Sequence, residues 1–207
     1  MRELPAPPLP AERGEPLEHG AYISDFRARR RATRDHAHWK LERRQHFEEN
    51  DHPARDALRR GDWAEALRLF ESKRETVRQL AEADQRNGAP FRRLRVVEEP
   101  LTPYTQWELT ALRVRAEEGQ AARVLLAKEV AAAETEGPLP EIVIIGGHTL
   151  YEIIYTEAGA FESARRYTEP EIVAPWLDFV REAYAGAEDL RDYHERAVAH
   201  LPPPPAA

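Results

Sequence analysis

Arginines, carboxylates and aromatic side chains are concentrated in residues 91–118, FRRLRVVEEPLTPYTQWELTALRVRAEE. An arginine side chain binds carboxylate or phosphate groups through two parallel hydrogen bonds. Aromatic side chains supply the buried area by which a binding surface anchors its partner. We therefore predict that this stretch forms a binding surface or pocket, and its candidate residues are Arg93, Arg95, Tyr104, Trp107, Glu108, Arg113 and Arg115.

The local pattern predicts a strand, a turn with two prolines and a helix. Apolar residues are interleaved with arginines over residues 91–98, which is typical of a strand. A helix is predicted over residues 103–118. On this helix Tyr104, Glu108 and Arg115 share one face, where we expect ion pairs along the helix. The alternative is a solvated face whose salt bridges reach the arginines of the strand.

A second charged stretch lies closer to the N-terminus. Its candidate residues are Lys40, Glu42, Arg43 and Arg44. The pattern from residue 21 to residue 47 predicts a basic helix, and its segment from Arg27 to Arg44 is one candidate for contact with nucleic acid. A net charge of -7 disfavours a general nucleic-acid binder, and a run of charges is commonly only a solvated face.

The sequence contains no motif of a known reaction. The chain has no cysteine, which excludes disulfides, thiolate catalysis and cysteine-bound metals. His38 and Lys40 have the His-x-Lys spacing of phospholipase D, but Gln45 stands where that motif requires an aspartate. We also predict a helix here, whereas that chemistry uses a strand. No serine lies in a Gly-x-Ser-x-Gly turn.

Metal ions and cofactors are not expected. The histidines at positions 36, 38, 46 and 52 form no pair at the i, i+4 spacing by which one helix face binds a metal. An enzyme without a recognisable motif remains an alternative. It would use Glu108 or Glu141 as a general base beside an arginine, and this requires a carboxylate in a cleft with a raised pKa.

Proline-rich ends frame the rest of the chain. Residues 1–18 contain five prolines and are predicted to form a disordered arm, and residues 201–207 a similar tail. Residues 19–200 are predicted to form one α+β domain, with a helical part at 19–88 and a mixed α/β part at 89–200. A signal peptide and a membrane-spanning segment are not visible, so we expect a cytoplasmic protein that does not enter membranes.

Further elements follow from periodicity and turn residues. Asp62 has the position of a helix N-cap, with Glu65 three residues later. Gly146 and Gly147 separate two apolar runs and predict a hairpin. The remaining predicted helices cover 53–60, 62–86, 170–184 and 189–200, and the remaining strands cover 122–127, 141–145, 149–156 and 160–168.

Several segments resemble an actinobacterial family known only as domain-of-unknown-function family 6879. They are WKLERRQHF from Trp39, RGDWAEALRL from Arg60, RLRVVEEPLTPYTQWEL from Arg93 and LPEIVI from Leu139. The resemblance covers roughly residues 35–195 and implies no catalytic residues. Members of the family are often encoded beside helix-turn-helix regulators, which implies, by association, such a regulator as a protein partner.

The order of elements predicts an α+β fold, with a helical N-terminal part packed on a small mixed sheet that C-terminal helices close. This order is also similar to half of a phospholipase D-like domain. The catalytic His and Lys of that fold would fall near residues 136–142, where this chain has neither. We therefore predict a non-enzymatic binding or regulatory module that engages a protein partner or a small anionic ligand.

Overall fold

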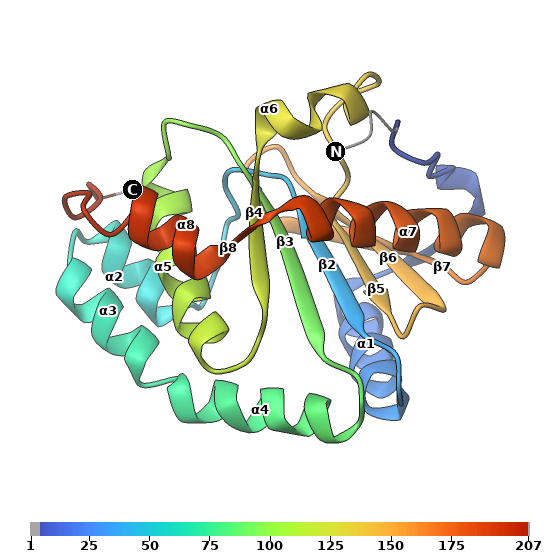
Figure 1. Ribbon diagram of the computed structural model, residues 1–207, viewed down its shortest axis with the longest axis horizontal. Coiled ribbons are helices and arrows are strands. Elements are labelled where there is room, and N and C mark those ends of the chain that lie inside the picture. The colour runs from blue at the N-terminus through green and yellow to red at the C-terminus, as the bar shows by residue number, and fades with distance from the viewer. Residues whose placement is uncertain (1–4, 207) are drawn as a thin grey trace.

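The computed structural model describes residues 5–206, and within them the chain alternates helices with the strands of one sheet (Figure 1). The strands are β1 Glu15–Leu17, β2 His38–Glu42, β3 Phe91–Val97, β4 Ala122–Leu126, β5 Ile142–Ile145, β6 Thr149–Tyr155, β7 Phe161–Tyr167 and β8 Glu188–Asp189. The helices are η1 Ala11–Arg13, α1 His19–Ala32, α2 Pro53–Arg59, α3 Trp63–Glu71, α4 Arg74–Arg86, α5 Pro103–Glu117, α6 Ala127–Val130, η2 Ala131–Ala133, α7 Pro170–Gly186 and α8 Leu190–Ala197.

The sheet has eight strands in the order β1-β7-β6-β5-β2-β3-β4-β8. β2, β3 and β4 run parallel to one another, and the other neighbouring pairs are antiparallel. The predicted α+β class is therefore confirmed. The sheet is larger than expected, because β1, β2 and β8 were not predicted. β2 comes from the part of the chain that was expected to be helical and lies at the centre of the sheet.

Helices cover both faces of this sheet (Figure 1). α7 packs on one face, where Trp176 and Phe179 join the largest apolar cluster with Leu41, Leu94 and other residues of the central strands. The opposite face carries two separate apolar clusters. One lies under α1 at β5, β6 and β7, and the other lies where α5 and α8 meet β3 and β4. None of the helices within residues 5–206 combines the length and the apolar character that crossing a membrane requires.

The predicted basic helix over residues 21–47 is wrong beyond Ala32. The amide and the hydroxyl of Thr33 both donate to the carbonyl of Arg29 and end α1, and Asp35 adopts a φ of 58° in the turn that follows. Residues 38–42 then alternate between the two sheet faces. Trp39 and Leu41 both enter the core beneath α7. In a helix, residues two positions apart point in nearly opposite directions, so a helix could not place both on one side.

Other predicted elements agree with the structure more closely. The strand at 91–98, the helix at 103–118 and the hairpin around Gly146 are confirmed within one residue or two. Asp62 accepts a hydrogen bond from the amide of Glu65, as its N-cap position predicts. The helix predicted over 62–86 is interrupted at Ser72 and Lys73 and forms α3 and α4.

Within the proline-rich segment 1–18, residues Ala11–Arg13 form η1 and residues Glu15–Leu17 form β1. β1 forms the edge of the sheet and pairs with β7, with Glu15 opposite Arg166. Gly14 permits this pairing, because a Cβ atom there would lie 2.7 Å from the ring of Tyr167. Residues 1–4 lie outside the described part of the chain.

Trp107 is a structural residue of the helical layer rather than an exposed anchor. It is 2% exposed, its indole nitrogen donates to the carbonyl of Ala54 at 3.1 Å, and its ring contacts Phe70. We expect Trp107→Ala to lower the free energy of unfolding by about 3–5 kcal/mol, as loss of a buried aromatic ring does. Leu80→Ala, at an exposed position of α4, should change it by less than about 0.5 kcal/mol. Urea unfolding followed by circular dichroism tests both, and equal losses would contradict this role.

Candidate functional site

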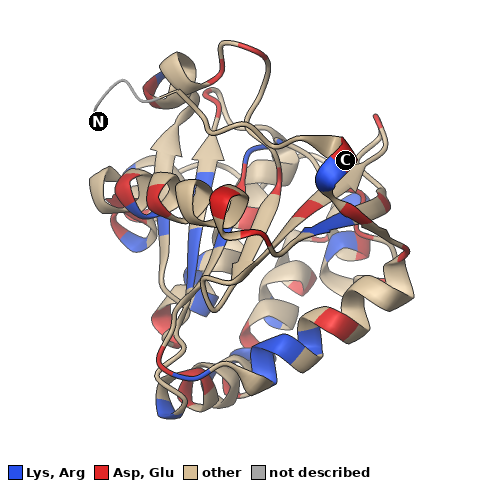
Figure 2. Ribbon diagram, turned by 90° about the vertical axis from the view of Figure 1, so that its right-hand side faces the viewer, with Lys and Arg blue, Asp and Glu red and all other residues tan. Residues whose placement is uncertain are grey.

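Charged side chains occupy the middle of the sheet face that α1 and α5 share. The register of β2 and β3 places Lys40 beside Arg93 and Glu42 beside Arg95. These four side chains point away from α7, because their neighbours along each strand enter the core on the α7 side. Charged residues are accordingly visible on the central strands as well as on the helices (Figure 2).

A single buried carboxylate, Glu42, holds the outer part of this cluster together. Its two oxygens form ion pairs with the amine of Lys40 and the guanidinium of Arg93, while Glu42 itself is only 3% exposed. Burial opposes ionisation of Glu42, but the positive charges of Arg93, Lys40 and Arg95 outweigh it and hold its pKa well below the usual range. Glu42 is therefore an anion shared by several cations.

The deeper part of the cluster is an ion pair between the sheet and α5. Arg95 is fully buried, and its Nε and Nη2 atoms lie 2.8 and 2.7 Å from Oε2 of Glu108. Its Nη1 atom donates to the carbonyl of Val96 at 2.9 Å. Burial raises the pKa of Glu108 and the charge of Glu42 adds to this, although Arg95 opposes both. The predicted pairing of Glu108 with Arg115 is thus replaced by a contact to the sheet.

Arg115 completes the cluster from α5 without a carboxylate partner of its own. Among the described residues its side chain donates only to Oε1 of Gln120, at 3.2 Å, and it forms no ion pair. Its side chain reaches solvent, yet enough protein surrounds it to lower its pKa, and the positive charge of Arg93 lowers it further. The charges of Arg93 and Glu42 both act on Arg115, so the two guanidinium groups lie near each other and near Glu42.

Glu141 borders the cluster at the start of β5. Its Oε1 accepts the backbone amides of Arg43 and Arg44 at 2.7 and 2.6 Å. Burial raises its pKa, and the nearby charge of Glu42 raises it further. Glu141 thus fixes the chain where it leaves β2.

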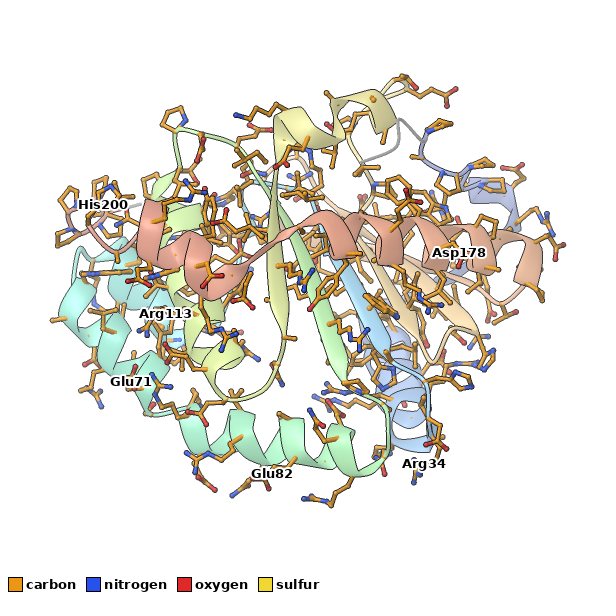
Figure 3. The ribbon with its side chains drawn as sticks, viewed as in Figure 1. Arg34, Glu71, Glu82, Arg113, Asp178 and His200 are labelled. Atoms are coloured by element: carbon orange, nitrogen blue, oxygen red, sulfur yellow. The ribbon has the colours of Figure 1, made fainter. Side chains whose placement is uncertain are left out.

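The remaining candidate residues lie outside the cluster. Tyr104 is 2% exposed and donates to Glu49 at 2.7 Å, so Tyr104 and Trp107 do not form an exposed aromatic surface. Arg113 pairs with Glu117 along α5 and points toward α8 (Figure 3). These three side chains therefore lie apart from the charged cluster, and a helix pattern alone does not show which face the sheet will cover.

Arg43 and Arg44 line a separate pocket of about 470 Å³ at the carboxyl ends of β2 and β3. The guanidinium of Arg43 is fixed there by Glu134 and Glu98, each with a contact of 2.6 Å. The second candidate patch is therefore divided. Lys40 and Glu42, on β2, join the charged cluster with Arg93, Arg95, Glu108 and Arg115. Arg43 and Arg44, which follow β2, lie instead at the pocket by the carboxyl ends of the strands.

Two tyrosines near the cluster were not identified from the sequence. Tyr22 on α1 and Tyr155 on β6 lie close enough to Glu42 for its charge to raise the pKa of both phenols, in addition to burial. No local motif marks these tyrosines. The pairing of β6 and β5 with β2 brings Tyr155 to these charges, and the packing of α1 on the sheet brings Tyr22.

Within residues 5–206 no group of three or more histidine, aspartate or glutamate side chains is arranged to hold a metal ion.

Comparison with curated proteins and with solved structures finds no match. A family model described as "Domain of unknown function (DUF6879)" matches residues 24–195. This match spans most of the chain and includes every residue of the cluster. The chain therefore belongs to the DUF6879 family.

Proposed function

We propose that this protein is a non-enzymatic binding module that holds a small anion, a carboxylate or a phosphate, against Lys40, Arg93 and Arg115. The observation that carries the proposal is the imbalance of charge at the outer part of the cluster. Lys40 and Arg93 both pair with the single carboxylate Glu42, and Arg115, on which the charges of Arg93 and Glu42 also act, forms no ion pair within the described chain. An anion would supply the missing negative charge and relieve the repulsion between the two arginines.

The deeper residues support this surface rather than contacting a ligand. Arg95 is fully buried and Glu108 is 6% exposed, and the two side chains form an ion pair with each other. A binding site discriminates ligands best when a packed outer support holds its contacting groups in place. The ion pair of Arg95 and Glu108 can give this support, because Arg95 lies directly beside Glu42 in the register of β2 and β3.

The same burial weakens the enzymatic alternative. Glu108 and Glu141 do have the raised pKa values that a general base would need. A general base must also come within hydrogen-bonding distance of the proton that it removes. Both carboxylates are nearly inaccessible and already accept hydrogen bonds, from Arg95 and from the amides after β2. We therefore favour binding over catalysis.

The nucleic-acid alternative loses its structural basis. It requires one continuous basic helix from Arg27 to Arg44, but α1 ends at Ala32 and Lys40 lies in a central strand. Arg34 lies just beyond α1, where its guanidinium donates to nearby backbone carbonyls (Figure 3). The association with a transcriptional regulator remains a prediction of the family resemblance.

The anion proposal predicts a specific loss on substitution of Arg115. Sodium phosphate and sodium citrate should raise the thermal unfolding midpoint of the wild-type protein more than sodium chloride at the same ionic strength does. Arg115→Gln should weaken the affinity for these anions at least tenfold, because one guanidinium in bidentate contact contributes about 1.5–3 kcal/mol. Arg86→Gln, a control at an exposed arginine of α4, should bind as the wild type does. Identical midpoints in phosphate, citrate and chloride would refute the proposal.

The affinity for an anion should also depend on pH. Burial raises the pKa of Glu108, so this group takes up a proton above the ordinary carboxyl range of about 4. Protonation removes a negative charge from the site, and anion binding should therefore strengthen as the pH falls. Isothermal titration with sulfate, whose charge is constant in this range, measures the effect from about pH 8 to pH 5. Glu108→Gln should flatten the dependence, and an unchanged slope in a folded Glu108→Gln protein would count against this role.

The supporting ion pair gives a stability prediction of its own. Arg95→Met leaves Glu108 buried without its partner and should lower the free energy of unfolding by about 3–5 kcal/mol. The double variant Arg95→Met, Glu108→Leu removes both charges and should recover most of that loss. Urea unfolding of the two variants, compared with Glu108→Leu alone, forms a double-mutant cycle. Additive losses would show that the pair is not coupled.

A further inference from the structure

The N-terminal arm lies along a groove beside α7 in the manner of a bound proline-rich peptide. Pro5, Pro7, Pro8 and Pro10 each fix φ near -65°, and Pro10 has φ and ψ of -69° and 113°. A polyproline II segment has three residues per turn, so positions i and i+3 share a side. Ala6 and Leu9 have this spacing, and both pack against the apolar cluster beneath α7.

The groove offers the contacts by which proteins recognise such segments. The indole nitrogen of Trp176 donates to the carbonyl of Pro8 at 3.3 Å, and residues 133–140 form the opposite wall. Aromatic side chains that line a groove are the usual means of binding a polyproline II helix, which has no internal hydrogen bonds. A space of about 360 Å³ remains between the arm and these walls.

Charge complementarity continues the contact beyond the prolines. The arm reads Pro7-x-x-Pro10, with Arg13 three residues later. The guanidinium of Arg13 lies 2.7 Å from Glu171 and 3.5 Å from Glu169, at the start of α7. The groove therefore has an apolar part for the prolines and an acidic end for a basic residue that follows them.

We infer that this groove is a binding site for a proline-rich segment of a partner protein, with the pattern Pro-x-x-Pro followed by arginine, and that the arm occupies it as an internal competitor. The packing of Ala6 and Leu9 on the apolar cluster and the hydrogen bond from Trp176 hold residues 5–9 in the groove. A tethered segment has an effective concentration in the millimolar range. A partner must displace the arm, and its apparent affinity is reduced while the arm stays in place.

The test uses the full-length chain and a fluorescein-labelled peptide with the arm's own sequence, PAPPLPAERG. In the double variant Ala6→Asp, Leu9→Asp, the internal arm no longer fits the groove. Fluorescence anisotropy should show that this variant binds the peptide at least tenfold more tightly than the wild type does. A control peptide with the same two aspartates should not bind. Trp176→Phe, added to the double variant, should weaken peptide binding about fivefold, because it removes one hydrogen-bond donor.

Gly14→Val provides a second way to release the arm, since its added carbon atoms would meet the ring of Tyr167. Circular dichroism establishes that each variant is folded. The inference is overturned if folded variants of both kinds bind the peptide no better than the control peptide. Concentration-dependent dimers of the wild type that Ala6→Asp, Leu9→Asp abolishes would assign the groove to the arm of a second copy instead of a partner.

Discussion

The position of Glu42 in a central strand constrains the sheet and the helices around it. An ionised carboxylate in this setting is tolerated only when cations and hydrogen bonds compensate for the water it has lost. Lys40, two residues before Glu42 on β2, supplies part of that compensation, and Arg93, which the parallel pairing of β2 with β3 brings to the carboxylate, supplies the rest. A shift of β2 by one residue in this pairing would move Lys40 and Glu42 to the α7 side of the sheet, into the apolar cluster.

The division of the helical layer follows from this constraint. On the face opposite α7, the apolar cluster under α1 uses Val143 and Tyr151, and the cluster at α5 and α8 uses Val97 and Val124. Between them the strands present lysine, arginine and glutamate. An apolar helix stripe placed over these charges would leave them without water or partners. α5 meets them instead with Glu108, which is why this helix carries a buried carboxylate.

Local signals explain which parts of the fold could be predicted. The helix from Pro103 and the hairpin at Gly146 are marked by residues within a few positions of each element, and both were identified. β2 was missed because its polar side chains, Lys40 and Glu42, are typical of a helix unless their distant partners are known. Arg93 is more than fifty residues away in the sequence, so composition shows that charges are abundant but not which of them meet. The tyrosines beside Glu42 were missed for the same reason.

The retention of buried charge is itself an argument about function. A buried ion pair such as that of Arg95 with Glu108 commonly gives no more stability than apolar residues of similar size would. Leu and Val would also satisfy the pattern of a strand covered on both faces. Charges at such positions are therefore better explained by what they hold in place than by the stability they give. Here they hold Glu42 and Arg93 near Arg115, an exposed residue that has no carboxylate partner in the described chain. That arrangement is the basis of the proposed anion site.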